Sequence, residues 1–165
     1  MLTKSQRYAS IRLADECWIV TALLHRDFPD HSDFTISEIV QRAEREMVSG
    51  EVRAGFRPHV TLHCVANLPP NPGKQRMLFA TGKHTRRLYR PGDDYHPQRE
   101  GSDECPARED VPEEYRDLLD WYTEYCNTPA QRAPDAFLEL FGSGRELWAN
   151  EKPADYVRRI REGFE

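Results

Sequence analysis

The sequence lacks the features that mark several large classes of protein. Its longest apolar run, CWIVTALL at residues 17–24, is far too short to cross a membrane. The first residues, MLTKSQRYASIRLADE, contain no apolar stretch like that of a signal peptide. We therefore expect a cytoplasmic protein.

Cysteine pairs and catalytic motifs are also missing. The four cysteines are widely separated, without a C-x-x-C pair, which favours reduced, structural thiols over disulfides. No glycine-rich phosphate loop follows a predicted strand, and no H-E-x-x-H motif is present. His59 and His63 have the spacing of metal ligands next to Cys64, but a site would need another ligand from elsewhere. We therefore predict no metal, no cofactor and no enzymatic activity.

Apolar residues are scarce for a chain of 165 residues. They make up 38% of the sequence, whereas charged residues make up 31% and there are 12 prolines. A chain of this composition buries little apolar surface per residue. We expect a core that leaves part of the chain outside it, with some segments ordered only on a partner.

Positive charge is concentrated in the middle of an acidic chain. Residues 51–92 contain 8 Lys and Arg against 1 acidic residue, a net charge of +7, and three of the six histidines. Residues 93–165 contain 9 against 19, a net charge of −10. A basic segment within an acidic protein indicates a surface that faces a polyanion.

The order of predicted elements suggests how this segment is folded. Hydrophobic periodicity predicts helices at about 10–26, 37–47 and 57–68, with a short strand at FTI before the second helix. After PPNPG, the strands RMLFAT and RRLYR flank a turn at GKHT. This order is typical of a winged helix-turn-helix, an α+β, mostly helical fold, in which the third helix enters the DNA major groove and the hairpin is the wing.

Three parts of the chain follow from these elements. Residues 1–92 are predicted to form the DNA-binding winged-helix domain. Residues 93–134 are predicted to be a linker with a supporting or dimerisation helix at about 112–126, because Pro, Gly, Asp and Glu dominate residues 91–111. Residues 135–165 are predicted to form an extended, helical C-terminal tail.

The predicted partner of the first part is double-stranded operator DNA, with RNA as the alternative polyanion. Basic side chains would contact phosphates, and His59, His63 and Asn67 would lie four residues apart on one face of the third helix, toward base edges. The residues predicted to bind DNA are Arg53, Arg57, His59, His63, Asn67, Lys74, Arg76, Lys83, His84, Arg86 and Arg87.

The end of the chain, KPADYVRRIREGFE, has the pattern of a short amphipathic helix. Pro153 suits the first helical position, and apolar residues from Tyr156 to Phe164 share one face. Either this face packs on the chain's own domain or it becomes ordered in the groove of a partner, with Trp148 as an anchor.

The segment SGRELWANEKPADYVRRIREGFE resembles the toxin-binding tail of VapB-type antitoxins from type II toxin–antitoxin systems, which commonly end in a YVRRLREGW-like helix. Residues 15–125 resemble instead a family of small prokaryotic proteins without assigned chemistry. The VapB resemblance implies that the tail inhibits a PIN-domain ribonuclease toxin, whose acidic, Mg²⁺-binding site an arginine would approach. The residues predicted to bind the toxin are Leu147, Trp148, Tyr156, Val157, Arg158, Arg159, Ile160, Arg161 and Phe164.

The sequence thus predicts an antitoxin with a DNA-binding half and a toxin-binding tail. VapB-type antitoxins typically carry a smaller DNA-binding domain than the one predicted here, which leaves the operator geometry open. The alternative is a stand-alone winged-helix transcriptional regulator whose tail packs on itself or mediates a homodimer.

Overall fold

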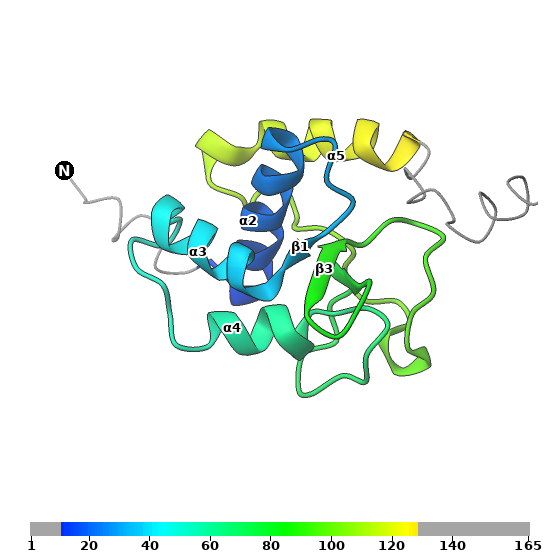
Figure 1. The fold of residues 1–165 in the computed structure, drawn as a ribbon. Helices are drawn as coiled ribbons and strands as arrows, with labels where there is room; N and C mark the ends of the chain where they lie inside the picture. The colour runs from blue at the N-terminus through cyan, green and yellow to red at the C-terminus, as the bar shows by residue number, and fades with distance from the viewer. Residues whose placement is uncertain (1–10, 129–165) are drawn as a thin grey trace, which may run out of the picture. The chain divides into compact units, whose positions relative to one another are not determined.

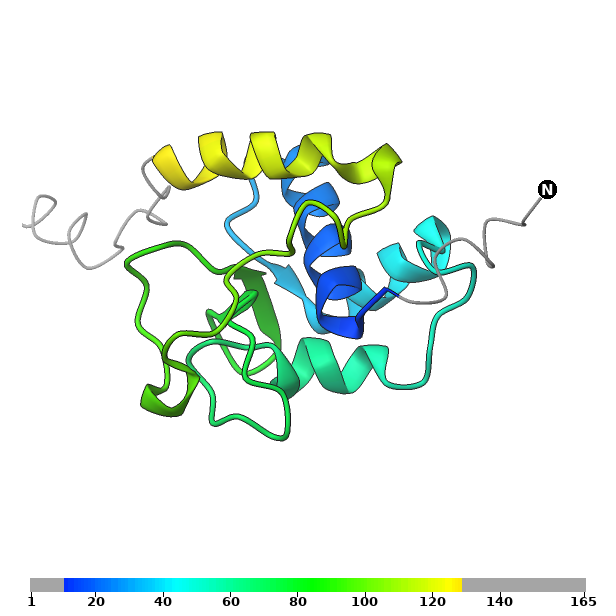
Figure 2. The ribbon, with the colours of Figure 1, turned by 180° about the vertical axis from the view of Figure 1, so that it is seen from behind.

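The computed structural model describes residues 11–128, which form an α+β fold with a small three-stranded antiparallel sheet. Helix α2 (Leu13–Asp27) lies in the middle, with α5 (Asp117–Asn127) along one side and α4 (Phe56–Pro58) on the other (Figures 1 and 2). No helix in this part of the chain is long and apolar enough to cross a membrane.

Helix α2 is the core helix because it is buried on all sides. Every residue from Ala14 to His25 is buried, and Trp18 packs edge-on against Tyr122 of α5 with ring centroids 5.3 Å apart. A helix without a polar face belongs in the centre of a fold. Its two buried acids are both paired with arginines: Asp15 accepts two hydrogen bonds from Arg12, and Glu16 accepts hydrogen bonds from Arg53 and Ser49.

Helix α3 (Ile36–Glu46) follows directly after strand β1 (Phe34–Thr35), as predicted. Its start is a capping box: the Glu38 amide donates to Thr35 Oγ1 at 3.2 Å, and the Thr35 amide donates to Glu38 Oε2 at 2.7 Å. The helix ends at Met47, whose φ of 51° is left-handed. Its buried face packs on α2 through Ile39 and Ala43.

The third helix is shorter than predicted. It consists of α4 (Phe56–Pro58) and a π-helical turn, η1 (His59–His63), so the expected continuation to residue 68 is wrong. The backbone from Cys64 onward is used by the sheet instead: the Ala66 amide donates to Leu78 O at 2.7 Å, and the Leu78 amide donates to Cys64 O at 3.0 Å. A backbone group that bonds to a strand cannot continue the helical ladder.

The predicted hairpin is present as β2 (Leu78–Ala80) and β3 (Thr85–Leu88). Strand β3 lies in the middle of the sheet, in the order β1-β3-β2, and Leu78 of β2 pairs with its Leu88. The Ile36 amide at the start of α3 also donates to His84 O at 2.9 Å. The hairpin is therefore attached to α3 as well as to β1.

Residues 89–128 cover one side of this core. They contain the turns η2 (Pro97–Arg99) and η3 (Glu113–Tyr115), followed by α5, close to the predicted helix 112–126. Leu118 and Tyr122 of α5 join the core around α2. All four cysteines are free thiols, and Cys17 and Cys64 are buried.

Candidate nucleic-acid interface

The helix α4–η1 and the turn of the β2–β3 hairpin lie next to each other because one side chain joins them. Arg86 of β3 donates to Gly82 O in the turn at 2.9 Å, and to Val60 O and Thr61 O in the helix at 3.1 and 2.9 Å. We call residues 56–63 and 81–85 together the helix–hairpin surface. Its geometry is fixed by a guanidinium that is itself only 2% exposed.

Three exposed basic side chains lie on the helix–hairpin surface or shortly before β2. Arg57 is in the first turn of the helix, Lys83 is at the tip of the hairpin, and Lys74 precedes β2. Within residues 11–128, none of the three forms a side-chain hydrogen bond or an ion pair, so their charges are available to an external anion. His84, also exposed, lies beside Lys83.

His59 and His63 lie on successive turns of the same helix and contact each other. Their ring centroids are 4.7 Å apart in an edge-on arrangement, and His59 Nδ1 lies 2.9 Å from Gly55 O. Burial, followed by the charges of His59 and Arg99, lowers the pKa of His63. A neutral His63 at pH 7 can both donate and accept a hydrogen bond.

Two buried arginines bind the end of this helix. Arg86 donates hydrogen bonds to the carbonyl oxygens of Val60 and Thr61. Arg99 donates to those of Leu62 and His63, at 3.0 and 2.9 Å. The last carbonyls of a helix lack partners within it and carry partial negative charge. The two guanidinium groups therefore cap the C-terminal end of the helix by donating to its last carbonyls. In the described part of the chain, neither forms an ion pair with a carboxylate.

Arg99 also organises the loop that follows the helix. Besides Leu62 and His63, its guanidinium donates to four further backbone carbonyls within 3.3 Å. These belong to Leu68, Pro69, Gly73 and Gln75. The side chain is fully buried, and burial lowers its pKa. Arg99 was not among the residues predicted from the sequence. Its only signal there is an arginine within an acidic segment, opposite a Pro- and Gly-rich loop whose carbonyls have few other donors.

Several arginines predicted to contact DNA are engaged within the protein. Arg53 pairs with the buried Glu16 at 2.5 Å, and Arg76 pairs with Glu104 at 2.8 Å. Arg87 binds Asp93 through both terminal nitrogens, at 2.6 and 2.7 Å. Such charge-assisted contacts are strong and hold the cation in place. With Arg86, these side chains account for much of the basic segment without any external anion.

Asn67 does not share a helix face with His59 and His63, because the helix ends before it. Its amide group forms two hydrogen bonds with the backbone of Ala80, one in each direction and both 2.9 Å long. The Asn67 side chain thus forms the hydrogen bonds with Ala80 that a neighbouring strand would otherwise form with β2. The expected row of three base-reading residues is reduced to the two histidines.

The residues predicted to bind a toxin, from Leu147 to Phe164, lie outside the described residues. Within residues 11–128, no group of three or more His, Cys, Asp or Glu side chains is placed to hold a metal ion. Comparison of the chain with protein-family models, curated proteins and solved structures gives no match.

Proposed function

We propose that the protein binds double-stranded DNA as a winged helix-turn-helix. The observation that carries the proposal is the order helix, strand, helix, helix, strand, strand, with the sheet order β1-β3-β2. The hydrogen bonds of Arg86 hold the hairpin turn beside the third helix. In such proteins the third helix enters the major groove and the wing contacts the backbone or the minor groove. The helix–hairpin surface has the corresponding elements side by side.

The available side chains suggest a division of roles on this surface. Arg57, in the first turn of the helix, is suited to guanine or to a phosphate beside the groove. Lys83 and Lys74 are suited to phosphates, and His59 and His63 to hydrogen bonds with base edges. The number of cations available for phosphate is thus about three, which corresponds to a salt slope of about −2.7 in log K against log salt concentration.

Removing one exposed cation should reduce both affinity and salt dependence. We expect Lys83→Gln and Arg57→Gln each to weaken binding to a DNA duplex and to reduce the magnitude of the salt slope by about 0.9, because one phosphate contact is lost. Fluorescence anisotropy with a labelled duplex between 50 and 300 mM salt measures both quantities.

The matched control is Arg108→Gln, which removes an exposed charge on the linker. Its ion-pair partner within residues 11–128 is the exposed Asp120, at 3.4 Å. This variant should leave the slope unchanged. If Lys83→Gln and Arg57→Gln behave like this control, the helix–hairpin surface does not contact phosphates and the proposed DNA-binding mode is wrong.

We further propose that the DNA-binding half belongs to an antitoxin whose tail inhibits a PIN-domain ribonuclease. The motif ELWANEKPADYVRRIREGFE in residues 146–165, which resembles VapB-type tails, supports this proposal. An amphipathic helix with a tryptophan anchor suits a groove on a partner protein, and its arginines suit an acidic active site. Binding of the toxin could then alter DNA affinity through linkage between the two sites.

Truncation separates the two halves of this proposal. A chain ending at residue 142 should lose inhibition of a co-expressed PIN-domain ribonuclease completely and keep DNA binding within about twofold, because the helix–hairpin surface remains. Growth rescue and anisotropy are the two readouts. Full rescue by the truncated chain would contradict a toxin-binding tail and favour the stand-alone transcriptional regulator.

A further inference from the structure

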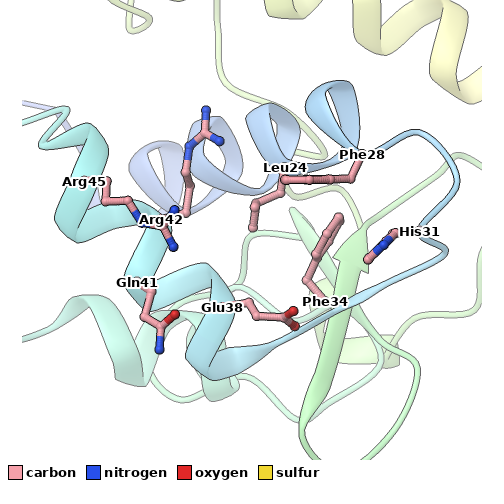
Figure 3. Close-up of a pocket in the computed structure, with 8 residues that line it drawn as sticks. All are labelled: Leu24, Phe28, His31, Phe34, Glu38, Gln41, Arg42 and Arg45. Atoms are coloured by element: carbon pink, nitrogen blue, oxygen red, sulfur yellow. The ribbon is translucent and has the colours of Figure 1, made fainter.

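A pocket of about 290 Å³ lies between the end of α2, the segment that leads into β1, and α3 (Figure 3). Leu24, Phe28 and Phe34 form one side, and Gln41 and Arg45 of α3 form the other. Its volume is at the lower end of the range for small-molecule sites. This size admits a ligand of one or two rings, but not a folded partner.

The apolar side of the pocket is an aromatic cluster. The rings of His31 and Phe34 are stacked, with centroids 5.4 Å apart and planes 17° from parallel, and Phe28 lies 5.7 Å from His31. Phe28 is 48% exposed, the highest value among the large hydrophobic residues of the described chain. Covering this ring with a flat apolar group would remove its exposed surface from water and add a ring contact.

The polar side of the pocket contains one cation that is available to a ligand. Arg42 is already paired, with Asp27 at 2.7 Å and Glu46 at 3.5 Å. Arg45 is exposed, and within residues 11–128 it forms no side-chain hydrogen bond or ion pair. A ligand with an anionic group could therefore pair with Arg45 without displacing an existing contact.

The one carboxylate in the pocket lining, that of Glu38, already accepts hydrogen bonds from Thr35 at the start of α3. Glu38 Oε2 accepts hydrogen bonds from the amide and the hydroxyl of Thr35, both at 2.7 Å. These bonds lower the pKa of Glu38 and hold its charge near the amide groups of the first turn of α3, which carry partial positive charge. Glu38 is thereby fixed at the start of α3, one end of the pocket, whereas Arg45 is near the other end of that helix.

We propose that this pocket binds a small planar aromatic acid. The ring lies against Phe28 and Phe34, and the carboxylate pairs with the Arg45 guanidinium in a charge-assisted contact that can use two parallel hydrogen bonds. None of the residues that line the pocket belongs to the helix–hairpin surface, although β1 and α3 contact the hairpin through Thr35 and Ile36.

The test is isothermal titration calorimetry on the full chain with indole-3-acetate and its neutral analogue indole-3-ethanol. We expect the acid to bind with a Kd of about 0.1–1 mM, as befits a ligand of this size, and about tenfold more tightly than the alcohol. Phe28→Ala should weaken both ligands at least fivefold. Arg45→Gln should remove the preference for the acid while leaving the alcohol unchanged.

Two control variants match these substitutions outside the pocket. Tyr95→Ala removes another exposed aromatic ring, and Arg108→Gln removes another exposed charge; neither should change either Kd. Phe28 and Arg45 are both exposed, so their variants should fold, which circular dichroism verifies. Absence of binding up to 5 mM, equal binding of acid and alcohol to the unmodified chain, or an unchanged Kd in Phe28→Ala each overturns the proposal.

Discussion

The substitution Arg99→Met should lower the free energy of unfolding by about 3–5 kcal/mol, the range for loss of a buried polar network. The guanidinium donates to six backbone carbonyls of residues 62–75. Methionine fills part of the space but donates nothing, so several of these carbonyls would be buried without a partner. A buried acceptor left without its hydrogen bond costs about 1–3 kcal/mol.

Urea denaturation followed by circular dichroism measures this change. The control Arg108→Met removes an arginine that is exposed and whose ion pair with Asp120 is also exposed, and it should change the free energy of unfolding by less than about 0.5 kcal/mol. Arg99→Lys should fall between the two, because an ammonium group reaches fewer carbonyls than the planar guanidinium. If Arg99→Met proves as stable as the Arg108 variant, Arg99 does not support the loop.

The same reasoning applies to Arg86 and changes how its variants should be read. Arg86 bonds to carbonyls of both the helix and the hairpin turn, so its removal would disturb the helix–hairpin surface itself. Weaker DNA binding by Arg86→Ala would then report a damaged fold rather than a lost phosphate contact. Arg57 and Lys83, which are exposed and unpaired within residues 11–128, are the informative positions.

The elements of the fold were largely predictable because each has a local signal. The apolar run around Trp18 predicts the core helix, and the β-branched and aromatic residues on either side of GKHT predict the hairpin. The start of α3 is set by the Thr35 and Glu38 capping box, a pattern that is readable from their spacing. These signals depend on neighbours in the chain, which the sequence contains directly.

The end of the third helix was not predictable from its periodicity. Val65 and Leu68 continue the apolar spacing of the helix, but the backbone around Cys64 and Ala66 bonds to β2. This competition depends on where the hairpin lies, which is a property of the whole fold. Tertiary contacts commonly override local preference in this way.

The net charge of residues 51–92 does not show which of their basic side chains are available to bind an external anion. The sequence does not distinguish an arginine that pairs with Glu16 or Asp93 from one that faces solvent. The acidic partners of these arginines lie elsewhere in the fold. Arg99, which binds the last carbonyls of the third helix, lies outside the basic segment. The candidate surface therefore keeps only part of the predicted set, chiefly Arg57 and Lys83 with the neighbouring histidines.

The second large effect we expect is a loss of stability in mild acid caused by His25. The side chain is 3% exposed, lies between the rings of Phe34 and Tyr125, and its Nε2 has no hydrogen-bond partner in the described structure. Burial, followed by the charges of Arg90 and Arg87, lowers its pKa from 6.5 to about 3. The folded protein therefore keeps His25 neutral at pH values where the unfolded chain binds a proton.

The sign follows from this difference in proton binding. Above pH 6.5 both states carry a neutral His25 and its contribution to stability is fully present; as the pH falls from 6.5 toward 3, unfolding takes up a proton and becomes more favourable. The slope is about 1.4 kcal/mol per pH unit, which amounts to about 2.7 kcal/mol at pH 4.5. Carboxylates that titrate in the same range add to the total, so a matched variant is required.

The variant His25→Met fills a similar apolar space and cannot bind a proton. Urea denaturation of both proteins between pH 7.5 and 4.5 gives the free energy of unfolding at each pH, and the difference between them isolates His25 because every other titrating group is shared. We expect this difference to shift by about 2.7 kcal/mol in favour of the variant across the range. Parallel curves would show that His25 titrates alike in both states, and that its ring is not held in an environment that excludes its charge.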